Sequence, residues 1–337
     1  MAWVKLAKPL VRPEAPAAHL KHHHADVNKL LGDVKGVGAA TAATANLPCC
    51  LIGMEACSGA HHWAREFGKF GHTVRLMAPK FVTTYRMSGK NDAADAAAIA
   101  EAVTRSNMRF VPVKSIEQQS GLFVHRARQG YVEQRTALIN RIRGLLSELG
   151  IVLPLKAATI RRQAHQHPED LPGWCNTVIG DALNELTRLD ERVNQYDRHL
   201  ALIAKEDAHC AQPMRLNGTG PTTASAIVAT VGRGHDFRCG RQFCAWLGLV
   251  AGQYSSGGKQ RLGRITKAGD PYLRTLLIMG GKAVLAAAKN KTDPMSRWAI
   301  SVQARRGYWK AVVAIAAKNA RMCWAMLQRG GSFKMPA

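Results

Sequence analysis

Cys50-Leu51-Ile52-Gly53-Met54-Glu55 is a short apolar run that ends in an acid. Such a run predicts a buried β-strand. Helix-like spacing follows over residues 58–69, and a second apolar run covers residues 73–77. An alanine-rich helix is expected over residues 91–104, with Asn91 as its N-cap. Strands and helices alternate in this part of the chain, which predicts an α/β domain.

The middle of the chain is predicted to form two long helices. Residues 115–149 carry apolar residues at helical spacing with arginines between them, and residues 174–207 repeat apolar residues at intervals of three and four. The pattern leaves three arrangements open: antiparallel pairing, self-association, or a solvated helical hairpin without a partner. From Met214 onward the sequence predicts short helices joined by glycine-rich loops, which form a second functional domain.

The charge balance indicates a polyanionic partner. Lysine and arginine number 47 against 23 aspartates and glutamates, which gives a formal net charge of +24 and a pI near 10.2. A charge of this size repels itself in the compact state, so a phosphate-bearing partner is its simplest explanation. Between Arg238 and Ala337 the only acids are Asp270 and Asp293, and we therefore expect DNA to lie against this half of the chain.

Several protein classes are disfavoured by the sequence. No stretch reaches the roughly 18 consecutive apolar residues of a membrane helix, and the N-terminus lacks the apolar core of a signal peptide. A cytoplasmic protein without a membrane partner is therefore expected. The eight cysteines form no Cys-x-x-Cys pair, so we expect neither a zinc site nor disulfide bonds.

Three acids are candidates for holding a metal. Asp92 and Asp95 lie three residues apart near the start of a predicted helix, so both carboxylates project from one face. Glu55 ends a predicted strand, and a parallel sheet would carry it toward the same edge. Magnesium prefers oxygen ligands of this kind. The alternative is a pair of solvated surface carboxylates.

A serine among cations is the second candidate site. Ser256 lies in the loop Tyr254-Ser255-Ser256-Gly257-Gly258-Lys259. A serine attacks phosphorus only if its proton is removed and the developing charge is held, which the nearby cations could do. A glycine-serine linker is the alternative interpretation. The cations are Lys259, Arg261, Arg264 and Lys267.

A glycine-rich turn is the third candidate. Residues 216–224 match the turn of a helix-hairpin-helix, in which Gly218 and Gly220 let backbone amides approach a phosphate at a helix N-terminus. Such a contact holds the DNA backbone without reading its sequence. A simple interhelical turn is the alternative.

Residues 51–61 and 89–96, which read LIGMEACSGAH and GKNDAADA, resemble the acidic-tetrad (DEDD) domain of transposases of the insertion sequence 110 family, 1111 subgroup. The resemblance implies an RNase H-like fold similar to that of the RuvC Holliday-junction resolvases. It also implies that four acids bind the metal, Mg²⁺. Glu55, Asp92 and Asp95 take the last three places of that tetrad.

The first acid of the tetrad is the point at which the chain departs from the family. Val4-Lys5-Leu6-Ala7-Lys8 places Lys5 where the family's first strand has aspartate. Residues 1–45 also lack the family's opening β-hairpin, as a disordered or frameshifted segment or a decayed element copy would. Asp26 or Asp33 could in principle substitute for the missing acid.

The serine-bearing half resembles the same transposases. The Ser-Gly-Gly-Lys loop is followed by the pattern Gly-x-Ile-Thr-Lys-x-Gly at residues 263–269, by Leu273-Arg274 and by a matching tail at residues 306–321. The resemblance implies that Ser256 is the nucleophile, with Ser255 as the alternative. The likeness covers about residues 45 to 332. The expected nucleic-acid contacts are Gly218, Gly220, Lys259, Arg261, Arg264, Lys267 and Arg274.

These observations predict four segments: an atypical segment over 1–45, the rest of the RNase H-like domain over 46–113, a long helical hairpin or coiled coil over 114–210, and a mainly helical serine-bearing transposase domain over 211–332. The implied function is cleavage and transfer of DNA strands by a bacterial, nucleoid-associated homo-oligomer, a dimer or tetramer, directed by a noncoding RNA. Two rivals remain: a metal-dependent nuclease of resolvase type, in which water attacks, and a catalytically inactive nucleic-acid-binding remnant.

Overall fold

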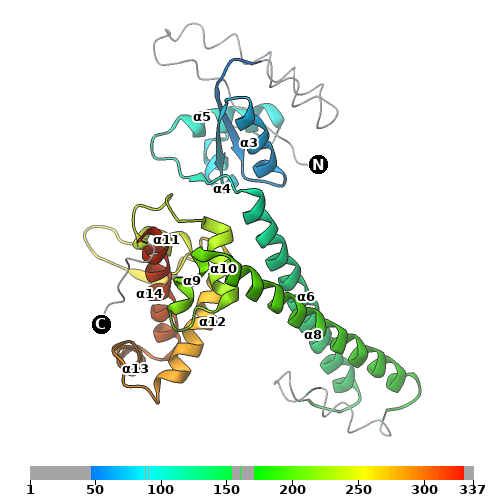
Figure 1. Cartoon of the computed structure of the whole chain (residues 1–337). Coiled ribbons are helices and arrows are strands. Elements are labelled where there is room, and N and C mark those ends of the chain that lie inside the picture. The colour runs from blue at the N-terminus through cyan, green and yellow to red at the C-terminus, as the bar shows by residue number, and fades with distance from the viewer. Residues whose placement is uncertain (1–46, 88, 90, 154–159, 161–170, 330–337) are drawn as a thin grey trace. The chain divides into compact units, whose positions relative to one another are not determined.

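The computed structural model describes residues 47–87, 89, 91–153, 160 and 171–329. The chain divides into two compact units, Met1–Ser115 and Ile116–Ala337 (Figure 1). The described residues are mixed α/β and mostly helical. The predictions for residues 1–45, and with them Lys5, Asp26 and Asp33, fall outside the described residues.

The first unit is built on a small sheet. Strand β1 (Leu51–Glu55) runs parallel to β2 (Thr73–Met77), which pairs antiparallel with the short β3 (Phe110–Val111), in the order β1-β2-β3. The two apolar runs of the sequence therefore form strands, as predicted, and the structure makes these strands neighbours. Their connection is the helix α3 (Ala60–Lys69), and α4 (Pro79–Val82) and the 3-10 helix η2 (Thr83–Tyr85) follow β2.

The alanine-rich helix is α5 (Asp92–Thr104), and its start agrees with the predicted cap. The side-chain oxygen of Asn91 accepts a hydrogen bond from the amide of Ala94 at 2.7 Å. This bond satisfies one of the amides that the first turn of a helix leaves without a partner. The cap therefore fixes the start of α5, so that Asp92 and Asp95 fall at the beginning of this helix.

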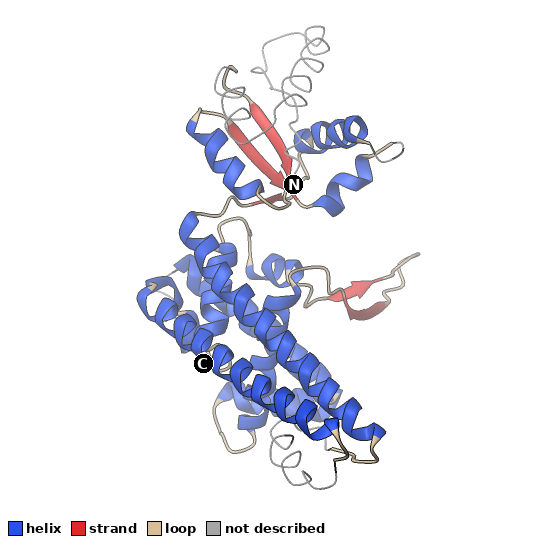
Figure 2. Ribbon diagram, turned by 90° about the vertical axis from the view of Figure 1, so that its right-hand side faces the viewer, coloured by secondary structure: helices blue, strands red, loops and turns tan. Residues whose placement is uncertain are grey.

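Two apolar clusters pack on opposite faces of the sheet, with helices on both sides (Figure 2). Ile52 and Met54 pack with Phe67 of α3 in one cluster, whereas Leu51 packs with Ile99 of α5 in the other. Because side chains two residues apart share a face of a strand, Glu55 lies on the α5 face together with Leu51.

The second unit contains the two long helices, α6 (Ile116–Glu148) and α8 (Trp174–Glu206), each of 33 residues, which lie side by side (Figure 1). Ion pairs join Arg128 to Asp197 and Arg135 to Asp190. A step of seven residues forward on α6 matches seven backward on α8, so the helices run antiparallel. Their buried seam includes Leu138, Ile142, Leu146, Ile179, Leu183 and Leu186.

A buried helix, α10 (Pro221–Val231), contacts α6, α8 and α12, and the C-terminal helix α14 contacts α11, α12 and α13. The long helices and the C-terminal helices thus share one unit. Two of the helices are longer than the short ones that the sequence predicts, since α12 has 18 residues and α14 has 22. The other elements are α9 (Ala208–Ala211), η3 (Pro213–Arg215), α11 (Gly240–Trp246), β4 (Ala251–Gln253), β5 (Leu262–Ile265), α12 (Pro271–Ala288), α13 (Pro294–Arg306) and α14 (Tyr308–Arg329).

The structure bears on the protein classes considered above. None of the helices in the described residues is both long enough and apolar enough to cross a membrane. All eight cysteines lie in the described residues, where they form no disulfide bond with one another, and four of them are buried. Burial raises the pKa of the Cys210 and Cys323 thiols to about 12, as expected of thiols in apolar surroundings.

Candidate functional site

The serine loop is the tip of a β-hairpin made by β4 and β5, which projects from the helical body of its unit (Figure 2). The amide of Lys259 donates to the carbonyl of Ser256 at 3.1 Å, which closes a two-residue turn. Gly257 and Gly258 have φ of 56° and 74°. Two consecutive positive φ angles are typical of the tight hairpin turn that matches strand twist, and they favour glycine. The glycine pair therefore holds Ser256 at the start of a defined turn.

The two adjacent serines make different contacts. The hydroxyl oxygen of Ser255 accepts hydrogen bonds from the amide of Arg261 at 3.0 Å and from Nε2 of Gln253 at 2.9 Å. The exposed Ser256 hydroxyl makes no hydrogen bond to any residue that the structure describes. Ser255 thus fastens the two strands of the hairpin together, and the Ser256 oxygen is available to another molecule.

The base of the hairpin is fixed by backbone contacts and by one arginine. Nη1 of Arg274 donates to the carbonyl oxygens of Leu247 at 3.0 Å and Gly269 at 3.2 Å. Gly248, with φ of 71°, packs against the backbone of Lys267, whose own φ is 52°. Arg274 was predicted to contact nucleic acid; the structure gives it a positioning contact that the sequence pattern did not reveal.

The hairpin carries a dense positive charge. Between Arg238 and Ala337 the chain has 18 lysines and arginines and two acids. Both acids cap helices, because Asp270 accepts from the amides of Tyr272 and Leu273, and Asp293 accepts from Ser296. Among described residues 238–328, no cation forms an ion pair. The exposed cations of the hairpin are Lys259, Arg261, Arg264 and Lys267.

The predicted phosphate-binding turn has a structural use at one of its glycines. Gly218 has φ of 82°, and a Cβ at this position would lie 2.6 Å from the carbonyl oxygen of Gly280 and 2.7 Å from Val284. This glycine is therefore needed for close packing on α12, which favours the interhelical-turn interpretation for it. Gly220 is exposed and precedes Pro221 at the start of α10. A Cβ added at this position would have no atom within 4 Å, so packing does not require glycine here.

The acids of the first unit are brought to one face of the sheet. Glu55 ends β1 on the α5 face, and α5 packs on β1. Asp95 lies in the first part of α5, where Nη1 of Arg86 approaches its Oδ1 at 3.4 Å. Arg86 is a contact that the sequence analysis missed, because no local pattern links a loop arginine to a helix acid. The side chain of Asp92 falls outside what the structure describes.

The donor atoms of this acidic face fit a hard divalent cation. Carboxylate oxygens are the ligands that such ions prefer, and Glu55 and Asp95 both supply them. Within the described side chains, no three histidines, cysteines or acids come together as a metal cluster. Glu55 and Asp95 would therefore supply only part of a ligand set, to which Asp92 and an acid from the first 46 residues would have to add.

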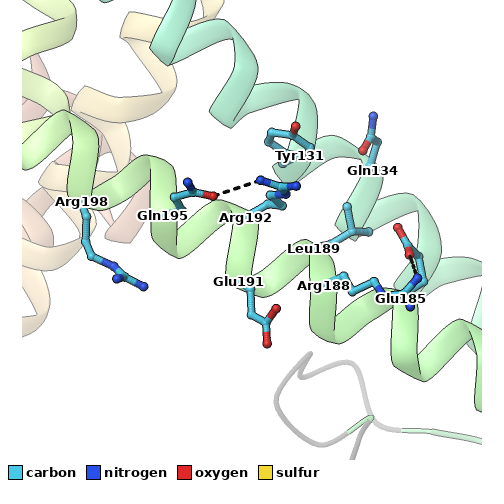
Figure 3. Close-up of a pocket in the computed structure, with 9 residues that line it drawn as sticks. All are labelled: Tyr131, Gln134, Glu185, Arg188, Leu189, Glu191, Arg192, Gln195 and Arg198. Atoms are coloured by element: carbon cyan, nitrogen blue, oxygen red, sulfur yellow. Dashed lines mark hydrogen bonds and ion pairs between the residues drawn. The ribbon is translucent and has the colours of Figure 1, made fainter.

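A separate groove of about 710 Å³ lies along the paired long helices (Figure 3). Arg192 donates to Gln195 at 3.2 Å, and Arg188 pairs with Glu185 at 3.7 Å. Because Glu185 and Glu191 offset most of the charge of Arg188, Arg192 and Arg198 in this groove, it attracts phosphate less than the hairpin does.

Comparison with known proteins finds transposase families in two regions of the chain. A transposase family profile of the DEDD type, described simply as "Transposase", matches residues 19–151. A second, described as "Transposase IS116/IS110/IS902 family", matches residues 211–296. The first match begins well before residue 45, so the likeness extends further toward the N-terminus than the motifs indicated. Lys5 lies outside it.

Individual relatives cover most of the chain. The chain is 46% identical over 288 residues to a "Probable family 20 transposase" of Pseudomonas aeruginosa, covering 84% of this chain and 85% of the relative. It is 41% identical over 299 residues to the "Transposase for insertion sequence element IS1111A" of Coxiella burnetii, covering 86% and 80%. A transposase for IS1328 of Yersinia enterocolitica is 33% identical over 291 residues, covering 86% and 87%. The chain therefore belongs to the IS110 family of insertion sequence transposases.

Proposed function

We propose that this transposase cleaves and transfers DNA strands through attack of Ser256 on a DNA phosphate. The observation that carries the proposal is the exposed Ser256 hydroxyl, which has no hydrogen-bond partner in the described residues and lies at the tip of a hairpin rich in cations. Ser255 is the weaker candidate, because its oxygen already accepts two hydrogen bonds. Family membership supports strand cleavage and joining as the reaction class.

In the proposed step, Oγ of Ser256 forms a bond to phosphorus while the bond from phosphorus to one sugar oxygen breaks. The displaced sugar oxygen takes up one proton, which balances the proton that the serine loses. Negative charge builds up on the phosphate, and cations already oriented around it lower the cost of that charge. Lys259 and Arg261 follow Ser256 on the same hairpin and would supply this field.

A divalent metal is implied for this family in general, and we propose that Mg²⁺ binds at Glu55, Asp92 and Asp95 under an RNase H-like fold. When bound, the ion would neutralise charge on the attacked phosphate. Glu55 reaches this face from the end of β1, and Arg86 holds Asp95 from the loop before α5. The acids and Ser256 belong to different units of the chain, and the proposal includes a homo-oligomer, a dimer or tetramer, that assembles them.

The proposed partners are DNA and a noncoding guide RNA. DNA follows from the reaction class, and its phosphates would neutralise the cations of the second unit. The RNA rests on the resemblance, and the arginines along α6 are compatible with it.

Trapping a covalent adduct tests the nucleophile. Wild-type protein, Ser256→Ala and Ser255→Ala would be incubated with DNA that carries the element ends, and protein-linked DNA would be measured. Ser256→Ala should lose the adduct while its DNA affinity stays within about two-fold, because one hydroxyl is removed from a strongly cationic surface. Ser255→Ala is the matched control and should keep the adduct.

Three results would count against the proposal. An adduct in Ser256→Ala would overturn the assignment of the nucleophile. Metal-dependent cleavage without any adduct in the wild type would indicate a resolvase-type nuclease in which water attacks. Binding without cleavage or adduct would indicate an inactive remnant.

A further inference from the structure

The corner between α13 and α14 carries an exposed surface that the proposed chemistry does not use. Gly307, with φ of 83°, donates its amide to Gln303 at 2.8 Å and accepts at its carbonyl from Ala311 at 3.1 Å. It therefore ends one helix and begins the next within a single residue. All residues from 304 to 310 are exposed, and they include the motif Arg306-Gly307-Tyr308-Trp309-Lys310.

Two aromatic rings stand at this corner. Trp309 is 64% exposed and Tyr308 is 39% exposed, and the centres of their rings lie 5.3 Å apart in an edge-to-face arrangement. The core-facing side of α14 is formed by other residues, such as Val312 and Ile315, which are fully buried. Trp309 thus contributes little to the core, and its flat face is largely open to a ligand.

Cations surround these rings. Nζ of Lys282, from α12, lies 5.7 Å from the centre of the Trp309 ring. Arg305 and Arg306 end α13, and Lys310 follows the tryptophan. The sequence has no acid after Asp293. A surface that combines flat aromatic faces with uncompensated positive charge matches a ligand that combines flat rings with phosphates.

We propose that this aromatic corner, formed by Lys282, Arg305, Arg306, Tyr308, Trp309 and Lys310, binds unpaired DNA, with a base stacked on Trp309 and phosphates against the cations. In a duplex the faces of the bases are covered by their neighbours, so only an unpaired strand offers a base for stacking. The choice of DNA rests on the proposed function, because strand transfer separates strands that must be held until they are rejoined.

Binding measurements on the full chain test the corner without any need for cleavage. Fluorescence anisotropy would give the affinity for three labelled ligands: single-stranded DNA, a duplex of equal length, and a strand of equal length made of abasic residues. Trp309→Ala should weaken binding of single-stranded DNA by about 5- to 150-fold, the range for loss of one base-aromatic stack. Its affinities for the duplex and the abasic strand should stay within about two-fold.

Two further variants separate stacking from charge and from general surface effects. Trp174→Ala removes another exposed tryptophan, 84% exposed at the start of α8, and should leave all three affinities unchanged. Arg306→Gln should weaken all three ligands together, because it removes a phosphate contact that does not depend on the bases. Circular dichroism and the melting temperature would check that Trp309→Ala keeps its fold.

Several outcomes would overturn the proposal. One is an equal loss of affinity for single-stranded, duplex and abasic DNA in Trp309→Ala, and another is no loss of affinity for any of the three. If Trp309→Ala bound DNA as the wild type does but sedimented as a smaller oligomer, the corner would be a self-association surface. Trp309-dependent binding of RNA but not of DNA would overturn the choice of ligand. The Ser256→Ala protein should show the same dependence on Trp309, so failure of the nucleophile assignment and failure of this inference can be told apart.

Discussion

The hydroxyl of Tyr272 lies 3.0 Å from Nδ1 of His125, which joins the helix that follows the serine hairpin to the first long helix. On the other side of the ring, Nε2 lies 3.2 Å from the oxygen of Ser225. Ser225 donates its own hydrogen to the carbonyl of Pro221 at 2.7 Å, so it accepts from Nε2. Nδ1 is then left to accept from Tyr272. This network of hydrogen bonds holds His125 neutral between α6, α10 and α12.

Stability should fall with acidification because of His125. Burial, together with the charge of Arg128, lowers the pKa of His125 to about 4. The unfolded chain takes up this proton near pH 6.5 and the folded chain only near pH 4, so the contribution is present above pH 6.5 and is lost between these values. Its size is about 3 kcal/mol. Urea unfolding from pH 7 to 4 would measure it, and His125→Gln should remove this part of the slope. The exposed control His62→Gln should keep the wild-type dependence of the unfolding free energy on pH. If His125→Gln also kept it, the dependence would belong to other groups.

Close packing of two glycines should make α12 intolerant of a methyl group. Gly280→Ala would drive a Cβ into the backbone of Gly218 and should lower the free energy of unfolding by about 1–3 kcal/mol. Gly144→Ala, in α6 with nothing within 4 Å of the added Cβ, should instead stabilise by up to about 1 kcal/mol. Melting temperatures would decide, and equal shifts in the two variants would rule out the packing role.

DNA binding should weaken steeply with salt. Each neutralised phosphate contributes about −0.9 to the slope of log affinity against log salt concentration. The double variant Lys259→Gln/Arg264→Gln removes two hairpin cations that form no ion pair with any described residue, and it should make that slope shallower by about 2. Lys69→Gln, where the lysine already pairs with Glu66, is the control and should change nothing. A slope near zero in the wild type would exclude an electrostatic grip.

Metal-dependent activity should require Asp95. Asp95→Asn keeps the size of the side chain but removes the charge that a divalent ion needs, so activity in magnesium should be lost. Glu101→Gln is the matched control on the same helix, where the exposed glutamate pairs with Arg105. Retained rates in Asp95→Asn would show that activity does not require the Asp95 carboxylate as a metal ligand.

The N-terminal segment should decide whether the tetrad is complete. If Val4–Lys8 forms the family's first strand, Lys5→Asp should tighten magnesium binding and raise activity, because an ammonium group repels the cation. Calorimetric titration of magnesium into both proteins would measure the change. An unchanged magnesium affinity would show that Lys5 is not part of the site. Asp26 and Asp33, which lie inside the residues that the family profile matches, would then be the candidates for the first acid.

Several features of the candidate site could be predicted from the sequence because they depend on local patterns. The strand ending at Glu55 and the cap at Asn91 are each encoded within a few neighbouring residues. The family could likewise be assigned from short motifs. Hydrophobic periodicity and turn chemistry act over one element, so a single sequence is enough to detect them.

Local sequence patterns thus predicted the strands β1 and β2, the long helices, the excess of positive charge and the family. The use of particular side chains depends on contacts in three dimensions: Ser255 is hydrogen-bonded and Ser256 is available, Arg274 holds the base of the hairpin, and Gly218 is needed for packing on Gly280. The reason is physical. A hydrogen bond or a close contact depends on where two segments meet in space, and residues 62 positions apart, such as Gly218 and Gly280, share no local pattern that reveals their contact.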